Sequence, residues 1–133
     1  MGADDSTGMP DEYPKHTVKV DSFWMDEHEV TNREFAAFVA ATGYVTTAEK
    51  PITKEELMAN MPPGSPEPDS SMLAAGALVF TPPDHAVPFN DVSQWWSFVP
   101  GASWKHPEGP GSDLTNRDDQ PVTQVSWLDA VAF

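Results

Sequence analysis

The spacing of apolar residues first indicates a strand. In residues 16–25, HTVKVDSFWM, Val18 and Val20 alternate with polar neighbours, and this period of two predicts an extended, half-buried segment. Phe23 and Trp24 follow directly and are expected to be core residues. The segment is therefore predicted to be the first core strand.

The period then changes to that of a helix over residues 32–42. Thr31 and Glu34 have the spacing of a capping box, and Gly43 is placed to end the helix in a left-handed turn. Three apolar side chains fall on one face of this helix: Phe35, Phe38 and Val39.

The pattern becomes irregular after this helix. Thr53 and Glu56 predict a second, short helix, and the four prolines and one glycine of MPPGSPEPDSS predict the loop that ends it. Residues 76–80 (GALVF) and 121–126 (PVTQVS) are the remaining predicted strands. The chain has 14 prolines among 133 residues, about twice the ordinary usage of about 5%. This predicts one domain with little regular structure.

The end of the chain carries a further helix start. Ser126 is placed as an N-cap with Asp129 three residues on, and apolar residues follow at helical spacing up to Phe133. A helix of two turns is marginal alone. We therefore expect the chain to be the front part of a longer domain, so that the fold seen in these residues is incomplete. The alternative is a short terminal helix docked by Phe133.

Composition excludes several classes of partner. Seven basic and 21 acidic residues give a net charge of -14, which repels nucleic acids and anionic membranes. No apolar run approaches the roughly 20 residues that cross a bilayer. There is no cysteine, so a disulfide or thiolate metal site within these residues is excluded. The N-terminus lacks the pattern of a secretory signal, and we expect a cytoplasmic monomer.

A loop rich in Trp, Pro and Gly is the most distinctive feature. Residues 101–112, GASWKHPEGPGS, are expected to be rigid, because prolines restrict the chain and glycines permit positive φ. Trp104 is interpreted as a core residue. The adjacent Trp95 and Trp96 are expected to diverge, so that one is buried and the other forms the wall of a ligand site.

Other polar groups are weaker candidates for chemistry. Residues 26–30, DEHEV, lack the helical His pair of a zinc protease and are interpreted as a polar turn, in which Glu29 accepts a buried hydrogen bond. His106 is a possible general base, but it lacks a partner acid nearby and is interpreted as structural. Neither a Gly-x-Ser-x-Gly elbow nor a phosphate-binding loop occurs.

Several blocks together resemble the formylglycine-generating enzyme (sulfatase-modifying factor) family. They are MGADD and DEYPKHTVKVDSFWMDEHEVTNREFAAFVAATGYVTTAEK at the front, WWSFVPGASWKHPEGPGS in the middle, and QPVTQVSWLDAVAF at the end. Residues 51–91 match poorly and are treated as a variable insert within a single partial domain, 1–133.

The resemblance implies an α+β, C-type-lectin-like fold and an oxidase. Family members use copper and molecular oxygen to convert the cysteine of a sulfatase Cys-x-Pro-x-Arg segment to Cα-formylglycine. The resemblance places the redox cysteines, and the residues of a possible calcium site, in the later part of the domain. No catalytic or metal-binding residue is assigned here, and the 133-residue chain alone is expected to be inactive.

What this chain is expected to contribute is part of the groove for the sulfatase polypeptide. The substrate-binding candidates are Trp95, Trp96, Tyr44 and Glu29. The alternative is a non-catalytic, C-type-lectin-like module that binds a peptide or protein. A related sulfoxide synthase is a third possibility, but those enzymes add a His-rich iron-binding domain of which the sequence shows nothing.

Overall fold

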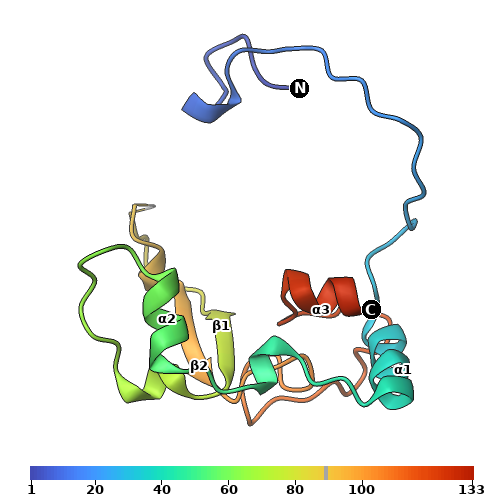
Figure 1. Ribbon diagram of the computed structural model, residues 1–133, viewed down its shortest axis with the longest axis vertical. Helices are drawn as coiled ribbons and strands as arrows, with labels where there is room; N and C mark the ends of the chain where they lie inside the picture. The colour runs from blue at the N-terminus through green and yellow to red at the C-terminus, as the bar shows by residue number, and fades with distance from the viewer. Residues whose placement is uncertain (89) are drawn as a thin grey trace.

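The fold combines helices with one small sheet, as an α+β class requires. The computed structural model describes residues 1–88 and 90–133. Its helices and strands are α1 (Asn32–Thr42), α2 (Lys54–Asn60), β1 (Gly76–Phe80), β2 (Trp96–Pro100) and α3 (Trp127–Ala132), shown in Figure 1. Short 3-10 turns lie at Pro10–Glu12, Thr47–Glu49, Ser70–Leu73 and Val92–Gln94. None of the described helices has the length and hydrophobicity needed to cross a lipid bilayer.

The three helices begin where their capping residues predict. Thr31, Thr53 and Ser126 are the N-caps, and each forms a capping box with the acidic residue three positions on. Gly43 ends α1 with φ of 68°, in the left-handed region. These predictions of the sequence are confirmed.

The strands of the described residues form one antiparallel pair. Gly76 of β1 lies opposite Pro100 of β2, and Phe80 lies opposite Trp96. The predicted strand at 76–80 is confirmed, whereas β2 was not predicted, because the prolines and glycines around it masked a short extended run.

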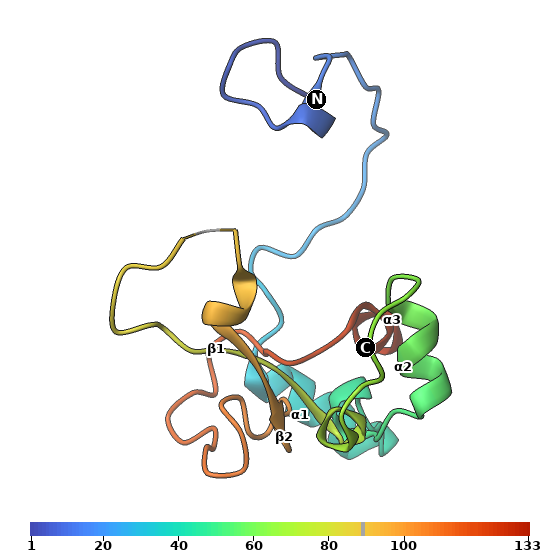
Figure 2. The ribbon, with the colours of Figure 1, turned by 90° about the vertical axis from the view of Figure 1, so that its left-hand side faces the viewer.

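The prediction of a core strand at residues 16–25 is wrong. Residues 1–25 extend away from the body of the molecule in both views (Figure 1 and Figure 2), and Phe23 and Trp24 are 66% and 102% exposed. A strand needs partners for its N–H and C=O groups. Within the described chain, residues 17–25 form no backbone hydrogen bond.

The strand predicted at 121–126 is reduced to one bridge. Pro121 pairs with Thr31, and the Val122 N–H donates to the Val30 carbonyl at 2.9 Å. Gln124 then adopts φ of 58°, which interrupts the extended conformation.

An aromatic cluster forms the core. Phe35 and Trp104 are 1% and 4% exposed, and their rings meet edge to face with centroids 5.3 Å apart. Phe133 stacks on Phe35 at 6.0 Å and also contacts Phe38. The core position of Trp104 is confirmed, and α1, the 101–112 loop and the end of α3 share this cluster. Phe133 thus docks the terminal helix, while Trp127, at the start of that helix, is 76% exposed.

Backbone hydrogen bonds hold the 101–112 loop in place. Ser103 and His106 exchange two hydrogen bonds of 3.1 and 2.9 Å, and the Gly101 N–H donates to the Ala75 carbonyl at 2.8 Å. Gly109 has φ of 112° and approaches Val99, so that an added Cβ would lie 2.8 Å from Val99 Cγ1. Glycine is therefore required where the loop passes over β2.

Gly109→Ala is expected to destabilise the protein by about 2 kcal/mol. Alanine disfavours the positive φ of this position, and its methyl group would be too close to Val99. Equilibrium urea unfolding measures the loss. Gly111→Ala is the matched control, since a Cβ there has no heavy atom within 4 Å. Equal losses in the two variants would contradict the tight approach at Gly109.

Candidate functional site

Two adjoining hollows follow β1 and together are called the β1 groove. The larger, of about 430 Å³, lies between residues 78–80, Trp96, residues 107–108 and residues 123–125. The smaller, of about 220 Å³, lies between residues 76–77, residues 47–48 and residues 124–126. Gln124 and Val125 line both hollows. The groove is thus bounded by β1 on one side and by the chain that leads into α3 on the other.

An aromatic pair closes one end of the groove. Phe80 and Trp96 lie opposite each other on β1 and β2, and their rings meet edge to face at 5.6 Å. Trp96 is 42% exposed and Phe80 is 55% exposed. Trp95 is half-buried. The two neighbouring indoles therefore differ in exposure, although Trp95 is half-buried and not fully buried as predicted, and Trp96 lines the larger hollow.

The side of β1 that faces away from β2 carries unpaired backbone groups. The bonds from Thr81 N–H to the Trp95 carbonyl and from Gly101 N–H to the Ala75 carbonyl fix the ladder. In an antiparallel ladder every second residue turns its N–H and C=O outward, here Gly76, Leu78 and Phe80. Within the described residues these outward groups have no hydrogen-bond partner. The residues that line the groove therefore include an aromatic pair and a strand whose outer edge is unpaired within the described residues.

The far end of the groove is fixed by a buried carboxylate. Asp129 is 0% exposed, and one of its oxygens accepts from the Tyr44 hydroxyl at 3.0 Å and the Thr47 N–H at 2.9 Å. The other oxygen accepts from the Ser126 N–H at 2.7 Å. The side chain thus joins the 44–49 segment to the start of α3.

The charge of Asp129 is stabilised by this arrangement. Burial by itself raises the pKa of the carboxyl, but the hydrogen bonds from Ser126, Thr47 and Tyr44 outweigh burial and lower it below the usual value. The same contacts act on Tyr44: burial, then the bond to Asp129, raises the pKa of the phenol. Asp129 therefore stays ionised and Tyr44 stays neutral.

A second contact connects the 44–49 segment to the Trp104 loop. The Glu49 carboxylate accepts from Lys105 Nζ at 2.9 Å and from the Thr46 N–H at 3.0 Å. Burial raises the pKa of Glu49, and the bonds from Thr46 and Lys105 lower it by more. Both walls of the small hollow are thereby held to the core.

The structure does not bring all four substrate-binding candidates together. The ring of Tyr44 packs on that of Phe38, with centroids 5.4 Å apart, and its hydroxyl donates to Asp129. Glu29 lines two other hollows, both of which Pro121 also lines. Neither is among the residues that line the β1 groove. The predicted buried hydrogen bond of Glu29 is wrong within the described chain: its carbonyl, not its carboxylate, accepts a bond from His28 Nδ1.

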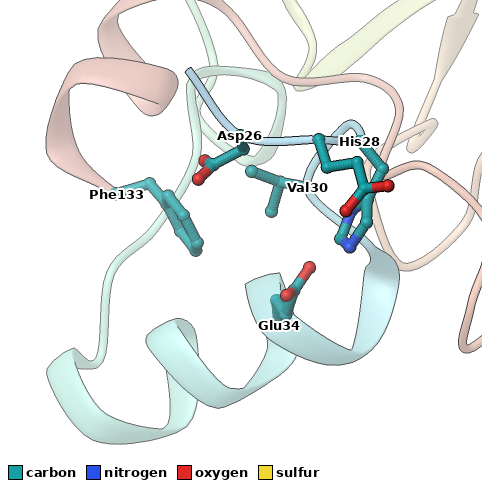
Figure 3. A pocket seen from close by; sticks show the side chains of 6 residues that line it. Asp26, His28, Val30, Glu34 and Phe133 are labelled. Atoms are coloured by element: carbon teal, nitrogen blue, oxygen red, sulfur yellow. The ribbon is translucent and has the colours of Figure 1, made fainter. Parts of the chain in front are cut away.

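The DEHEV segment forms a polar hollow of about 200 Å³ beside α1, shown in Figure 3. Asp26, His28, Glu34 and Phe133 line it, but the Glu34 carboxylate is engaged by the Thr31 N–H and hydroxyl at 2.8 and 2.7 Å. The bond to the Glu29 carbonyl, followed by the nearby Glu34, raises the pKa of His28. Of the acidic residues that line the hollow, Glu34 is therefore already engaged in capping α1.

His106 forms a hydrogen bond within its loop, in agreement with its interpretation as a structural residue. Its Nδ1 lies 2.6 Å from the Ser112 carbonyl and closes the 101–112 loop. The neighbouring Glu108 forms an ion pair with Arg117 at 2.6 Å, and this bond lowers the pKa of Glu108.

Residues 1–133 do not fit a copper centre. Copper(I) prefers soft sulfur ligands, and the sequence contains no cysteine. Among the described residues, no group of three His, Cys, Asp or Glu side chains is placed to hold a metal ion.

Two residues of the site were not recognised from the sequence. Asp129 was read only as a helix-capping residue, although the capping box did place it at the start of α3. Gln124 gave no signal, because its left-handed backbone and its place between two hollows depend on contacts distant in sequence.

Comparison with known proteins agrees with the resemblance seen in the sequence. The model of the sulfatase-modifying factor enzyme 1-like domain matches residues 1–133. A formylglycine-generating enzyme of Mycobacterium tuberculosis is 47% identical over 125 residues, covering 93% of this chain and 39% of the relative. A formylglycine-generating enzyme of Thermomonospora curvata is 44% identical, covering 100% of this chain and 39% of the relative. A mouse protein named inactive C-alpha-formylglycine-generating enzyme 2 is 32% identical, covering 100% and 37%.

Proposed function

Because the chain belongs to the sulfatase-modifying factor enzyme 1-like domain family, we propose that it supplies the peptide-binding groove of a formylglycine-generating oxidase. The chain spans about 39% of the length of the bacterial relatives it matches. In this proposal the oxidising centre, with its copper, lies outside residues 1–133, and so does any calcium site. The fold is proposed to be C-type-lectin-like.

The exposed indole of Trp96 beside an open strand edge is the observation that carries the proposal. The proposed substrate is a sulfatase segment, Cys-x-Pro-x-Arg, bound in extended form. Its proline is expected to pack against Trp96 and Phe80, which form an aromatic wall. The net charge of -14 attracts the arginine. Contacts of the peptide with Trp95, Tyr44 and Glu29 stay predictions.

Trp96→Ala is expected to weaken binding of the peptide about tenfold, because the aromatic wall is lost. The probe is a fluorescent peptide with serine in place of the cysteine, titrated into the protein and followed by anisotropy. Trp127→Ala is the control: Trp127 is 76% exposed but does not line the β1 groove. Equal affinity of the Trp96→Ala variant and the unmodified protein would overturn the groove assignment.

A chimera tests the oxidase as a whole. Residues 1–133 replace the matching region of the Mycobacterium tuberculosis relative, and mass spectrometry follows formylglycine in a cysteine peptide with copper and oxygen. Activity of the chimera, with none in the 133-residue chain, is the expected result. An inactive but well-folded chimera that still binds the peptide would favour the second candidate, a non-catalytic binding module. That candidate is favoured by the similarity to the mouse relative named inactive.

A further inference from the structure

Gln124 occupies an unusual position in the β1 groove. It lines both hollows, on the side opposite the strand. Its φ of 58° places it in the left-handed region, which among the described non-glycine residues is shared only by Asn116, with φ of 61°. Asparagine adopts this conformation readily, whereas glutamine does not. The strain at Gln124 is therefore imposed by its surroundings.

The side chain of Gln124 is fixed in one direction. Its Nε2 donates to the Pro107 carbonyl at 3.0 Å. A carbonyl can only accept, so the nitrogen faces Pro107 and the amide oxygen is left as an acceptor. Within the described residues that oxygen has no partner. Gln124 is half-buried, and it thus brings an unpaired acceptor to the residues that line the groove.

The opposite wall offers complementary groups. Gly76, Leu78 and Phe80 turn their free N–H and C=O groups away from β2. A peptide that pairs with this edge through alternate residues turns the N–H groups of the intervening residues to its other side. Those N–H groups then face the side on which Gln124 lies.

We propose that Gln124 is a peptide-binding residue, whose amide oxygen accepts a backbone N–H from an extended peptide that is paired with the edge of β1. The inference rests on the proposed function of the groove and adds the mode of recognition. Because the bonds are to the peptide backbone, this end of the groove accepts varied side chains. The aromatic wall of Trp96 and Phe80 supplies the preference for the substrate.

Gln124→Gly separates binding from stability. Glycine adopts positive φ without strain, and this relief offsets the loss of the bond to the Pro107 carbonyl, so the midpoint of urea unfolding is expected to change little. It lacks the amide, and we expect it to bind the serine-substituted peptide about fivefold more weakly, as the loss of one hydrogen bond requires. Asn116→Gly is the matched control, because it relieves the same backbone angle in a turn outside the groove and should leave affinity unchanged.

A second peptide tests the backbone contact itself. Methylation of the backbone nitrogens on one side of the peptide removes the N–H groups without changing its side chains, and binding should fall at least tenfold. The Gln124→Gly substitution should then cost nothing further against the peptide methylated on the side that faces Gln124. Unchanged affinity of Gln124→Gly for the unmethylated peptide would overturn the inference while leaving the groove intact. Failure of the unmodified protein to bind any of the peptides would overturn the proposed function and the inference with it.

Discussion

Trp104→Ala is expected to destabilise the protein by about 3–5 kcal/mol, the usual cost of removing a buried aromatic residue. Trp104 is 4% exposed, packs edge to face on Phe35, and has Lys105 Nζ 5.3 Å from its ring centre. Its loss leaves a cavity between α1 and the 101–112 loop. Equilibrium urea unfolding measures the change, and the slope of the transition shows whether the folded state stays compact.

Trp104→Phe is the informative companion variant. The indole Nε1 of Trp104 is buried and has no hydrogen-bond partner within the described residues. Phenylalanine keeps most of the ring and removes this unpaired N–H, so the loss should be only about 1 kcal/mol. A loss as large as that of the alanine variant would show that the N–H has a partner that the described residues do not supply.

The sequence predicted those parts of the fold that depend on neighbouring residues. The capping pairs at Thr31, Thr53 and Ser126 fixed the starts of all three helices, and Gly43 fixed an end. The core role of Trp104 also followed from its loop. These features are local, because a capping hydrogen bond spans only three residues.

The errors arose where an element depends on a distant partner. Residues 16–25 have the alternation of a strand, but within the described chain residues 17–25 form no backbone hydrogen bond. Residues 121–126 were predicted as a strand, but Gln124 turns left-handed and donates to Pro107, which is 17 residues away. Alternation shows which residues suit a sheet and does not supply the second strand.

The candidate site shows the same division. Trp95 and Trp96 were both predicted to bind the substrate; Trp96 does line the groove, and its contact with a peptide stays a prediction. Tyr44 was placed at the groove by resemblance, yet its hydroxyl bonds to Asp129, 85 residues away. A contact over that distance is set by packing, which no local pattern encodes.

Asp129→Ala is expected to cost about 3 kcal/mol, because it leaves the N–H groups of Thr47 and Ser126 and the hydroxyl of Tyr44 without their acceptor. Urea unfolding at neutral pH measures the loss. Asp21→Asn, in the exposed N-terminal segment, controls for the removal of one charge and should leave stability unchanged.

The pH dependence of unfolding tests whether the negative charge of Asp129 is responsible for this stabilisation. Its pKa in the folded protein lies below the usual Asp value of 3.8, so the folded state binds this proton less readily than the unfolded state. The stabilisation is therefore complete above the usual pKa and is lost as the pH falls through the folded value. Asp129→Asn should be less stable at neutral pH and should lose less stability than the unmodified protein on acidification. Parallel curves for the two proteins would show that the hydrogen bonds of Asp129 do not depend on its charge.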